Sequence, residues 1–131
     1  MYRVVMMYGT DEPWWFFEGW KEDIISVKEF DNFSRALKFY KNEWLDMAKK
    51  FEKYKSQDDL LSAFWEPQDQ IWCEECAGYQ QQYHGLALLE DWHQLPTEKK
   101  RWAYSKQSGE NPAKFCSTKL GHFDTLSSDL Y

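Results

Sequence analysis

The chain has 131 residues, and its 22 Asp and Glu against 16 Lys and Arg give a formal net charge of −6. This length is typical of one domain with its own core, and the chain shows neither the apolar run of a membrane-spanning helix nor a secretory signal. We therefore expect a cytoplasmic protein without membrane contact, with a single domain over residues 1–116 and a flexible tail over 117–131.

The first thirty residues predict three β-strands. Tyr2–Tyr8 is β-branched and apolar, and turn residues follow it at positions 9–13. Trp14–Trp20 is short and contains Gly19, which disfavours a helix, so we expect a second strand antiparallel to the first. Ile24–Phe30 is rich in β-branched residues and predicts a third strand.

Apolar residues at three- and four-residue spacing predict an amphipathic helix over Phe33–Tyr54, with Asp31 or Asn32 as its N-cap. The run Ser56–Asp59 is similar to a capping box and predicts a short helix through Trp65, which Pro67 ends. We expect the long helix to cover one face of the sheet.

The stretch Glu66–Leu89 has two interpretations. A helix would place aromatic and cysteine side chains on one face, whereas a turn around the cysteines would lead into a strand at Gly85–Leu89. We favour a helix or turn followed by this fourth strand, and then a basic helix after Pro96. The fold class is therefore predicted as α+β, with an N-terminal antiparallel sheet of three to four strands, a long covering helix and shorter C-terminal helices.

Cys73 and Cys76 form a single C-x-x-C motif, which suits a metal site, a redox pair or simple packing. A zinc site would use these thiolates and His84, with a fourth ligand from His93, Cys116 or His122, but the spacing matches no standard zinc module. Glu74 and Glu75 disfavour a redox enzyme, because carboxylates would raise the pKa of the thiols. Two reduced, packed thiols are the favoured interpretation, with zinc as the alternative cofactor.

Residues 97–119 hold six Lys or Arg against two Glu, which contrasts with the acidic remainder of the chain. Cations interleaved with aromatic rings are typical of nucleic-acid contacts. The candidate residues are Lys99, Lys100, Arg101 and Lys106, beside Trp102 and Tyr104. The same charges also suit a solvated helix face, or a basic segment folded onto the acidic body.

The chain contains none of the local motifs of hydrolase elbows, phosphate-binding loops or dinucleotide sites. We therefore expect a non-enzymatic binding or adaptor protein with a protein partner. Its contact surfaces would be the C-x-x-C region and the aromatic segment that includes Trp14, Trp15 and Trp20. A nucleic-acid-contacting accessory protein and a zinc- or thiol-dependent protein are the two alternatives.

Two segments carry a family resemblance, namely MYGTDEPWWFFEGWKEDI and AFWEPQDQIWCEECAGYQQQYHGLALL. Together they resemble a bacterial family known as domain of unknown function 1033, and the resemblance extends through about residue 106. It implies a small cytoplasmic protein and transfers no activity, ligand or catalytic residue.

Overall fold

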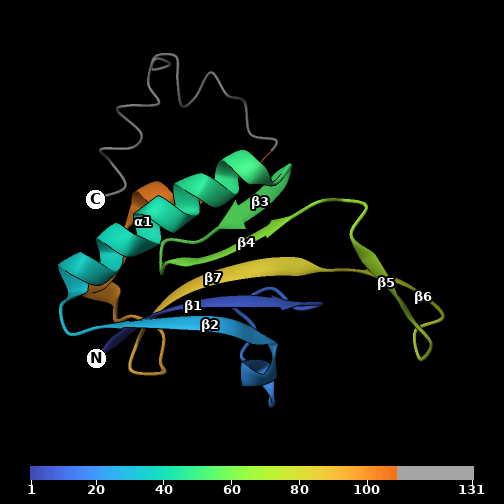
Figure 1. The fold of residues 1–131 in the computed structure, drawn as a ribbon, viewed down its shortest axis with the longest axis horizontal. Coiled ribbons are helices and arrows are strands. Elements are labelled where there is room, and N and C mark those ends of the chain that lie inside the picture. The colour runs from blue at the N-terminus through green and yellow to red at the C-terminus, as the bar shows by residue number, and fades with distance from the viewer. Residues whose placement is uncertain (109–131) are drawn as a thin grey trace.

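The computed structural model describes residues 1–108 (Figure 1). Within them the chain forms one α-helix, three short 3₁₀ helices and eight strands. In chain order these are β1 (Tyr2–Gly9), η1 (Trp20–Asp23), β2 (Ile24–Phe30), α1 (Phe33–Lys50), β3 (Lys53–Ser56), β4 (Leu61–Trp65), β5 (Gln70–Cys73), β6 (Gly78–Gln81), β7 (Tyr83–Glu90), η2 (Thr97–Lys99), η3 (Trp102–Tyr104) and β8 (Lys106–Gln107). The predicted tail at 117–131 lies outside the described residues. No helix in residues 1–108 is long and apolar enough to span a membrane.

Six of the strands form one antiparallel sheet in the order β2-β1-β7-β4-β3-β8. The α+β class is therefore confirmed, although the sheet is larger than the three to four strands expected. The strands predicted at Tyr2–Tyr8, Ile24–Phe30 and Gly85–Leu89 are present as β1, β2 and β7. The first strand pairs with β2 and β7, and not with the Trp14–Trp20 segment.

Helix α1 begins at Phe33, where the side chain of Asn32 accepts a hydrogen bond from the backbone N–H of Arg35 at 3.1 Å. Its buried face follows the predicted spacing and consists of Ala36, Leu37, Tyr40, Trp44 and Met47. The helix ends at Lys50, four residues earlier than expected. The next residues, from Lys53, form strand β3 because they pair with β4.

The helix predicted before Pro67 is wrong, because Leu61–Trp65 is strand β4. This strand is buried on both faces, so it lacks the alternation that identifies a half-exposed strand. The capping-box residues instead lead into a turn between β3 and β4, in which the N–H of Leu60 donates to the carbonyl of Gln57 at 3.1 Å. Leu60 adopts a left-handed backbone at φ 62° within this turn.

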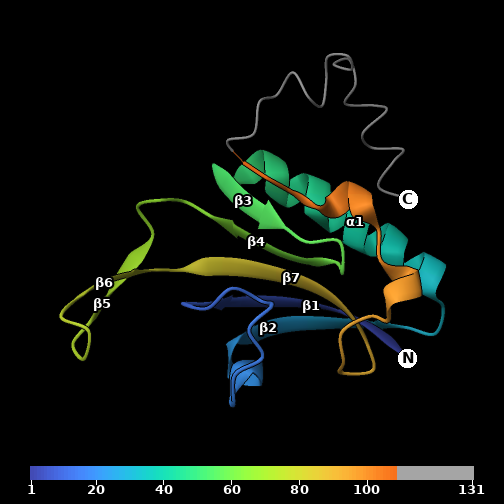
Figure 2. The ribbon, with the colours of Figure 1, turned by 180° about the vertical axis from the view of Figure 1, so that it is seen from behind.

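The predicted strand at Trp14–Trp20 is also wrong, since the segment is a loop that leads into η1. Gly19 has φ 82°, a backbone conformation that ends an extended run. The loop lies on the side of the sheet opposite α1, as both views show (Figures 1 and 2). Its aromatic side chains cover apolar residues on this face of the sheet. If the segment had paired as a strand beside β1, these residues would have stayed in water.

The sheet therefore has a core on each face. On the α1 side, Val4, Phe64, Leu86 and Leu88 pack against the buried helix residues. On the opposite side, a smaller core is covered by Trp14, Phe16, Trp20 and Trp92, and consists of Val5, Met7, Leu61, Ala87 and Leu89. Adjacent residues of β7 thus point into different cores.

The basic helix predicted after Pro96 is wrong as well. Residues 97–107 form the short turns η2 and η3 and the two-residue strand β8, which pairs with β3. Ala103 and Tyr104 are buried in the α1-side core. Contacts of these two side chains with α1 and the sheet hold the segment in an irregular path.

Candidate functional site

Strands β5 and β6 form a two-stranded arm, residues 70–81, that projects beyond the main sheet (Figures 1 and 2). The turn at its tip spans residues 74–77, where the N–H of Ala77 donates to the carbonyl of Glu74 at 3.2 Å. Ala77 itself has φ 52°. The chain thus turns tightly between Cys73 and Gly78, which are paired across the arm.

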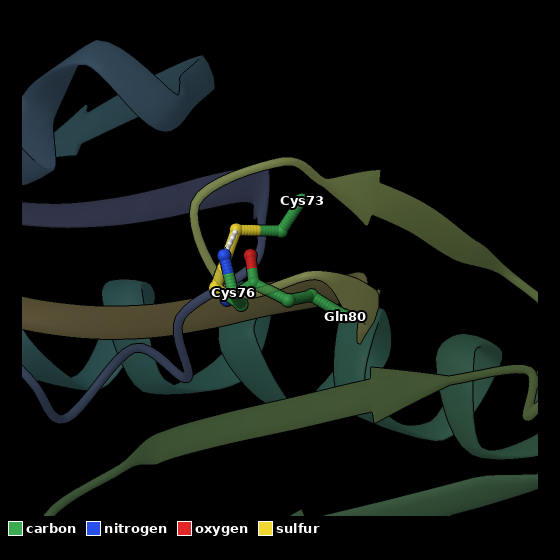
Figure 3. The surroundings of a disulfide bond; sticks show 3 residues. All are labelled: Cys73, Cys76 and Gln80. Atoms are coloured by element: carbon green, nitrogen blue, oxygen red, sulfur yellow. Dashed lines mark hydrogen bonds between the residues drawn. A yellow bond between two sulfur atoms is a disulfide. The ribbon is translucent and has the colours of Figure 1, made fainter.

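A disulfide joins Cys73 and Cys76 at this tip, across a Cα–Cα distance of 5.4 Å (Figure 3). The Cys73 sulfur also accepts a hydrogen bond from the backbone N–H of Cys76 at 3.2 Å, and the amide of Gln80 donates to the Cys76 sulfur at 3.4 Å. The two predicted zinc ligands are therefore bonded to each other. Within residues 1–108, no three His, Cys, Asp or Glu side chains form a group suited to a metal ion.

Two aromatic side chains stand next to the disulfide. Trp72 and Tyr79 are directly opposite each other on β5 and β6, and their rings meet edge to face with centroids 5.2 Å apart. Trp72 is 51% exposed and Tyr79 is 69% exposed. Ile71, one residue further from the tip, is 48% exposed. The arm thus presents three large apolar side chains to solvent.

Carboxylates lie in the tip turn of the arm and just before its first strand. Residues 66–82 contain no Lys or Arg, and their carboxylates are Glu66, Asp69, Glu74 and Glu75. The two glutamates lie in the exposed tip turn. An apolar pair flanked by carboxylates gives this element a distinct chemical character.

Hydrogen bonds fix the base of the arm to the main sheet. The Tyr8 hydroxyl of β1 donates to the Asp69 carboxylate at 2.9 Å, and the Gln82 amide donates to the Tyr8 oxygen at 2.7 Å. The Gln81 amide reaches the carbonyls of Glu66 and Asp69 at 2.8 and 2.9 Å. Burial, followed by the neighbouring Asp69, raises the pKa of Tyr8, so this hydroxyl stays protonated and keeps donating.

His84 lies at the base of the arm and not at its tip. It pairs with Phe64 in the main sheet, and its ring packs between those of Tyr8 and Phe51, at centroid distances of 4.5 and 4.6 Å. Burial lowers the pKa of His84. The structure therefore separates His84 from the two cysteines with which the sequence grouped it.

The three tryptophans of the predicted interaction surface have three different environments. Trp14 packs on the smaller core, whereas Trp15 is half exposed and stacks on Phe17. Trp20 lines an open groove of about 400 Å³ together with Phe16, Lys21, Trp92, His93 and Gln94. Lys21 and Arg3 lie 4.4 and 4.7 Å from the centre of the Trp92 ring, so cations of the chain itself already occupy the aromatic surface of this groove.

The four predicted nucleic-acid-binding residues do not form one exposed surface. The ammonium of Lys99 binds Glu90 at 2.8 Å and the Tyr2 hydroxyl, and Lys106 is only 6% exposed. Arg101 lies over the Phe33 ring and donates to carbonyls of its own segment, while Lys100 is 4.0 Å from Asp58. Nucleic-acid contact stays a prediction, with less cationic surface than a continuous helix would offer.

Comparison with family models gives a match over residues 1–118 to a family described as "Protein of unknown function (DUF1033)". The chain belongs to this family. The DUF1033 match includes both the aromatic loop and the arm, so it confirms the resemblance carried by those two segments. Searches of curated proteins and of solved structures gave no match.

Sequence reasoning missed the Trp72–Tyr79 pair in this DUF1033 chain, because a helical interpretation placed both residues on one face with Cys76. A signal for the arm is present nonetheless. Trp72 and Tyr79 each lie one residue outside the Cys73–Gly78 pair, as expected for a hairpin that closes across a short turn.

Proposed function

We propose that the protein is a non-enzymatic binding or adaptor protein that docks onto a partner protein through the arm. The observation that carries this proposal is the Trp72–Tyr79 pair, held in a fixed edge-to-face arrangement on a projecting element and more than half exposed. Large apolar side chains are costly to leave in water, and Trp and Tyr dominate the energetics of protein interfaces. Hydrogen bonds fix the base of the arm, and the two rings contact each other, so the pair is ordered before any partner arrives, which lowers the entropy lost on binding.

The charge of the arm indicates the chemistry of the partner. Glu74 and Glu75 lie in the exposed tip turn close to the apolar pair in sequence, and residues 66–82 contain no Lys or Arg. A complementary partner would carry an apolar pocket bordered by Lys and Arg, since opposite potentials accelerate association and reject acidic surfaces. Binding should therefore weaken as the salt concentration rises.

The groove beside Trp20 supports docking less well than the arm. Lys21 and Arg3 occupy the Trp92 ring there, and Arg3 is also bonded to Glu29 at 2.9 Å. A ligand would have to displace these contacts before reaching the ring. The rings on the arm have no such cation over them among the contacts of the described residues.

The proposal is tested by a photo-crosslinking amino acid placed at position 72 in cells. Trp102 is the matched control because it is 78% exposed and lies outside the arm. A protein crosslinked from position 72 and not from 102 is then purified, and its affinity is measured by calorimetry. We expect Trp72→Ala to weaken binding about 30-fold, the scale of an interface hot spot, and Trp102→Ala to change it less than about twofold.

Two results would overturn this function. One is a crosslinking experiment that does not distinguish the two positions, because 72 and 102 give the same crosslinked proteins or none. The other is an unchanged affinity of the purified partner for Trp72→Ala, when the circular-dichroism spectrum of this variant equals that of the wild type.

A further inference from the structure

We propose that the disulfide at the tip of the arm is a thiol–disulfide exchange site that is attacked at Cys76 and selects cationic thiols over anionic ones. The bond closes a four-residue turn at the end of a projecting element, outside both cores of the sheet. Breaking it does not require either core to open. Exchange can therefore proceed in the folded protein, independently of whether the arm docks onto a partner.

The geometry distinguishes the two sulfurs. Cys76 is exposed, whereas Cys73 is partly buried, so an incoming thiolate reaches Cys76 more easily. The backbone N–H of Cys76 donates to the Cys73 sulfur at 3.2 Å, and this donor can stabilise negative charge on Cys73 as the bond breaks (Figure 3). The donor to the Cys76 sulfur is the exposed side chain of Gln80, which has more rotatable bonds than a backbone N–H and offers less fixed support.

The step balances with a thiol reductant as its co-reactant. A thiolate bonds to the Cys76 sulfur while the bond between the two protein sulfurs breaks, and Cys73 leaves as a thiolate that takes a proton from water. A second thiolate then attacks the sulfur of the bound reductant and releases Cys76. Overall, two thiols are oxidised to one disulfide and two electrons reduce the protein disulfide to two thiols.

Electrostatics determine which thiols react. Glu74 and Glu75 lie between the two cysteines and are both exposed, with no Lys or Arg in residues 66–82 to neutralise them. An attacking thiolate already carries one negative charge, so a compensating ammonium group on the same molecule favours its approach. The substrate class is thus a thiol on a cationic molecule or a basic protein surface.

The test compares reduction of the oxidised protein by cysteamine, which is cationic, and by 3-mercaptopropionate, which is anionic. Every protein carries Cys116→Ser so that only one cysteine pair reacts. Rates are expressed per thiolate and measured at low salt. The rate with cysteamine is divided by the rate with 3-mercaptopropionate. In the double variant Glu74→Gln plus Glu75→Gln, this ratio should fall roughly tenfold, because a few unit charges interacting at close range in water change a rate on this scale. Glu18→Gln plus Glu22→Gln, which also removes two exposed carboxylates but lies outside the arm, is the matched control and should leave the ratio unchanged.

The position of attack is tested in the same reactions by acid quenching, alkylation and peptide mapping. We expect the mixed disulfide with cysteamine on Cys76. A mixed disulfide mainly on Cys73, a rate ratio unaffected by the two Glu→Gln changes, or reduction only under conditions that unfold the protein would each overturn the proposal. So would near-stoichiometric zinc held by both thiols in protein purified without chelator.

Discussion

A buried network of hydroxyl groups and one indole lies between α1 and the sheet. The Ser62 hydroxyl is 2.7 Å from the Tyr40 hydroxyl and 2.7 Å from that of Ser56, and the Trp44 indole N–H reaches both serines at 3.1 Å. Buried polar groups are costly unless they are paired, so these four residues fix how the helix sits on the sheet.

Ser62→Ala should lower the free energy of unfolding by about 1–3 kcal/mol, because the fully buried Tyr40 hydroxyl loses its hydrogen-bond partner. Urea denaturation measures this change, and Ser26→Ala on the exposed β2 is the control. Adding Tyr40→Phe should recover part of the loss, because no hydroxyl then remains unpaired. A loss below about 0.5 kcal/mol in Ser62→Ala would contradict the importance of the network.

His84 makes stability depend on pH in a defined direction. Burial between two aromatic rings lowers its pKa below the unfolded value of 6.5, with Lys50 adding to the shift and Asp69 opposing it. The unfolded chain thus binds a proton at higher pH than the folded chain does. The stabilisation is complete above pH 6.5 and is lost as the pH falls through 6.5 towards the lower folded pKa.

His84→Gln should therefore flatten the decline in urea midpoint between pH 7.5 and about 5.5. His93→Gln is the matched control, because that side chain lies on an exposed turn. Equal slopes for wild type and His84→Gln would show that the ring is as easily protonated in the folded chain as in the unfolded one.

At the scale of elements, the aromatic loop that precedes η1 acts as the lid of the smaller core. Trp14 packs on that core and is capped by the Lys55 ammonium, 5.4 Å from the ring centre. Its neighbour Trp15 points outward and is 50% exposed, with its indole N–H bonded to Glu12 at 3.2 Å. Adjacent residues of one type thus have different roles.

Trp14→Ala should destabilise the protein by about 2–3 kcal/mol, since a partly buried indole is removed from a packed cluster. Trp15→Ala is the matched control and should cost less than about 1 kcal/mol. Thermal and urea unfolding of the two variants give the comparison. If both lose the same stability, the loop does not cover the core in the way described.

The arm is an element whose stability is largely separate from that of the body. A disulfide that closes a four-residue loop contributes only about 2 kcal/mol in the chain-entropy model. The hydrogen bonds of Tyr8, Gln81 and Gln82 at its base connect the arm to the sheet. Changes at the tip should therefore stay local to the arm.

At the scale of the whole molecule, the uneven charge of the sequence becomes an internal contact. Within residues 1–108, Lys99 bonds to Glu90 and Lys100 approaches Asp58, so part of the basic segment lies on the acidic body. The Lys99 ammonium lowers the pKa of Glu90 by hydrogen bonding. Of the three interpretations of this charge pattern, the described residues favour self-complementarity.

How well each element could be predicted from the sequence depends on how its residues are divided between core and water. Helix α1 has one buried and one exposed face, so its periodicity located it, whereas β2 has no buried residue and was located by its β-branched composition. Strand β4 is buried on both faces and resembles a short apolar helix segment. The loop at Trp14–Trp20 resembles a strand in composition, and only the uncovered second face of a six-stranded sheet explains its path.

The candidate site was predictable in position but not in chemistry. The sequence made the C-x-x-C region a candidate contact surface and left a redox pair among its interpretations, yet it did not show that the cysteines bond to each other while His84 stays in the main sheet. Strand pairing determines the positions of the cysteines and of His84, because it places Cys73 opposite Gly78 and His84 opposite Phe64. The spacing of these residues in the sequence predicts neither of the two pairings.

Strand β2 forms one edge of the sheet and exposes Ile25 and Val27, a composition that invites strands of neighbouring molecules to add to it. The register with β1 shifts between Met6 and Met7, so this strand carries a bulge. Lys28 and Glu29 are exposed further along the same strand. Bulges and charges both interrupt flat pairing between molecules. The irregular start of β2 and its charged residues thus disfavour the addition of a further strand at this edge of the sheet.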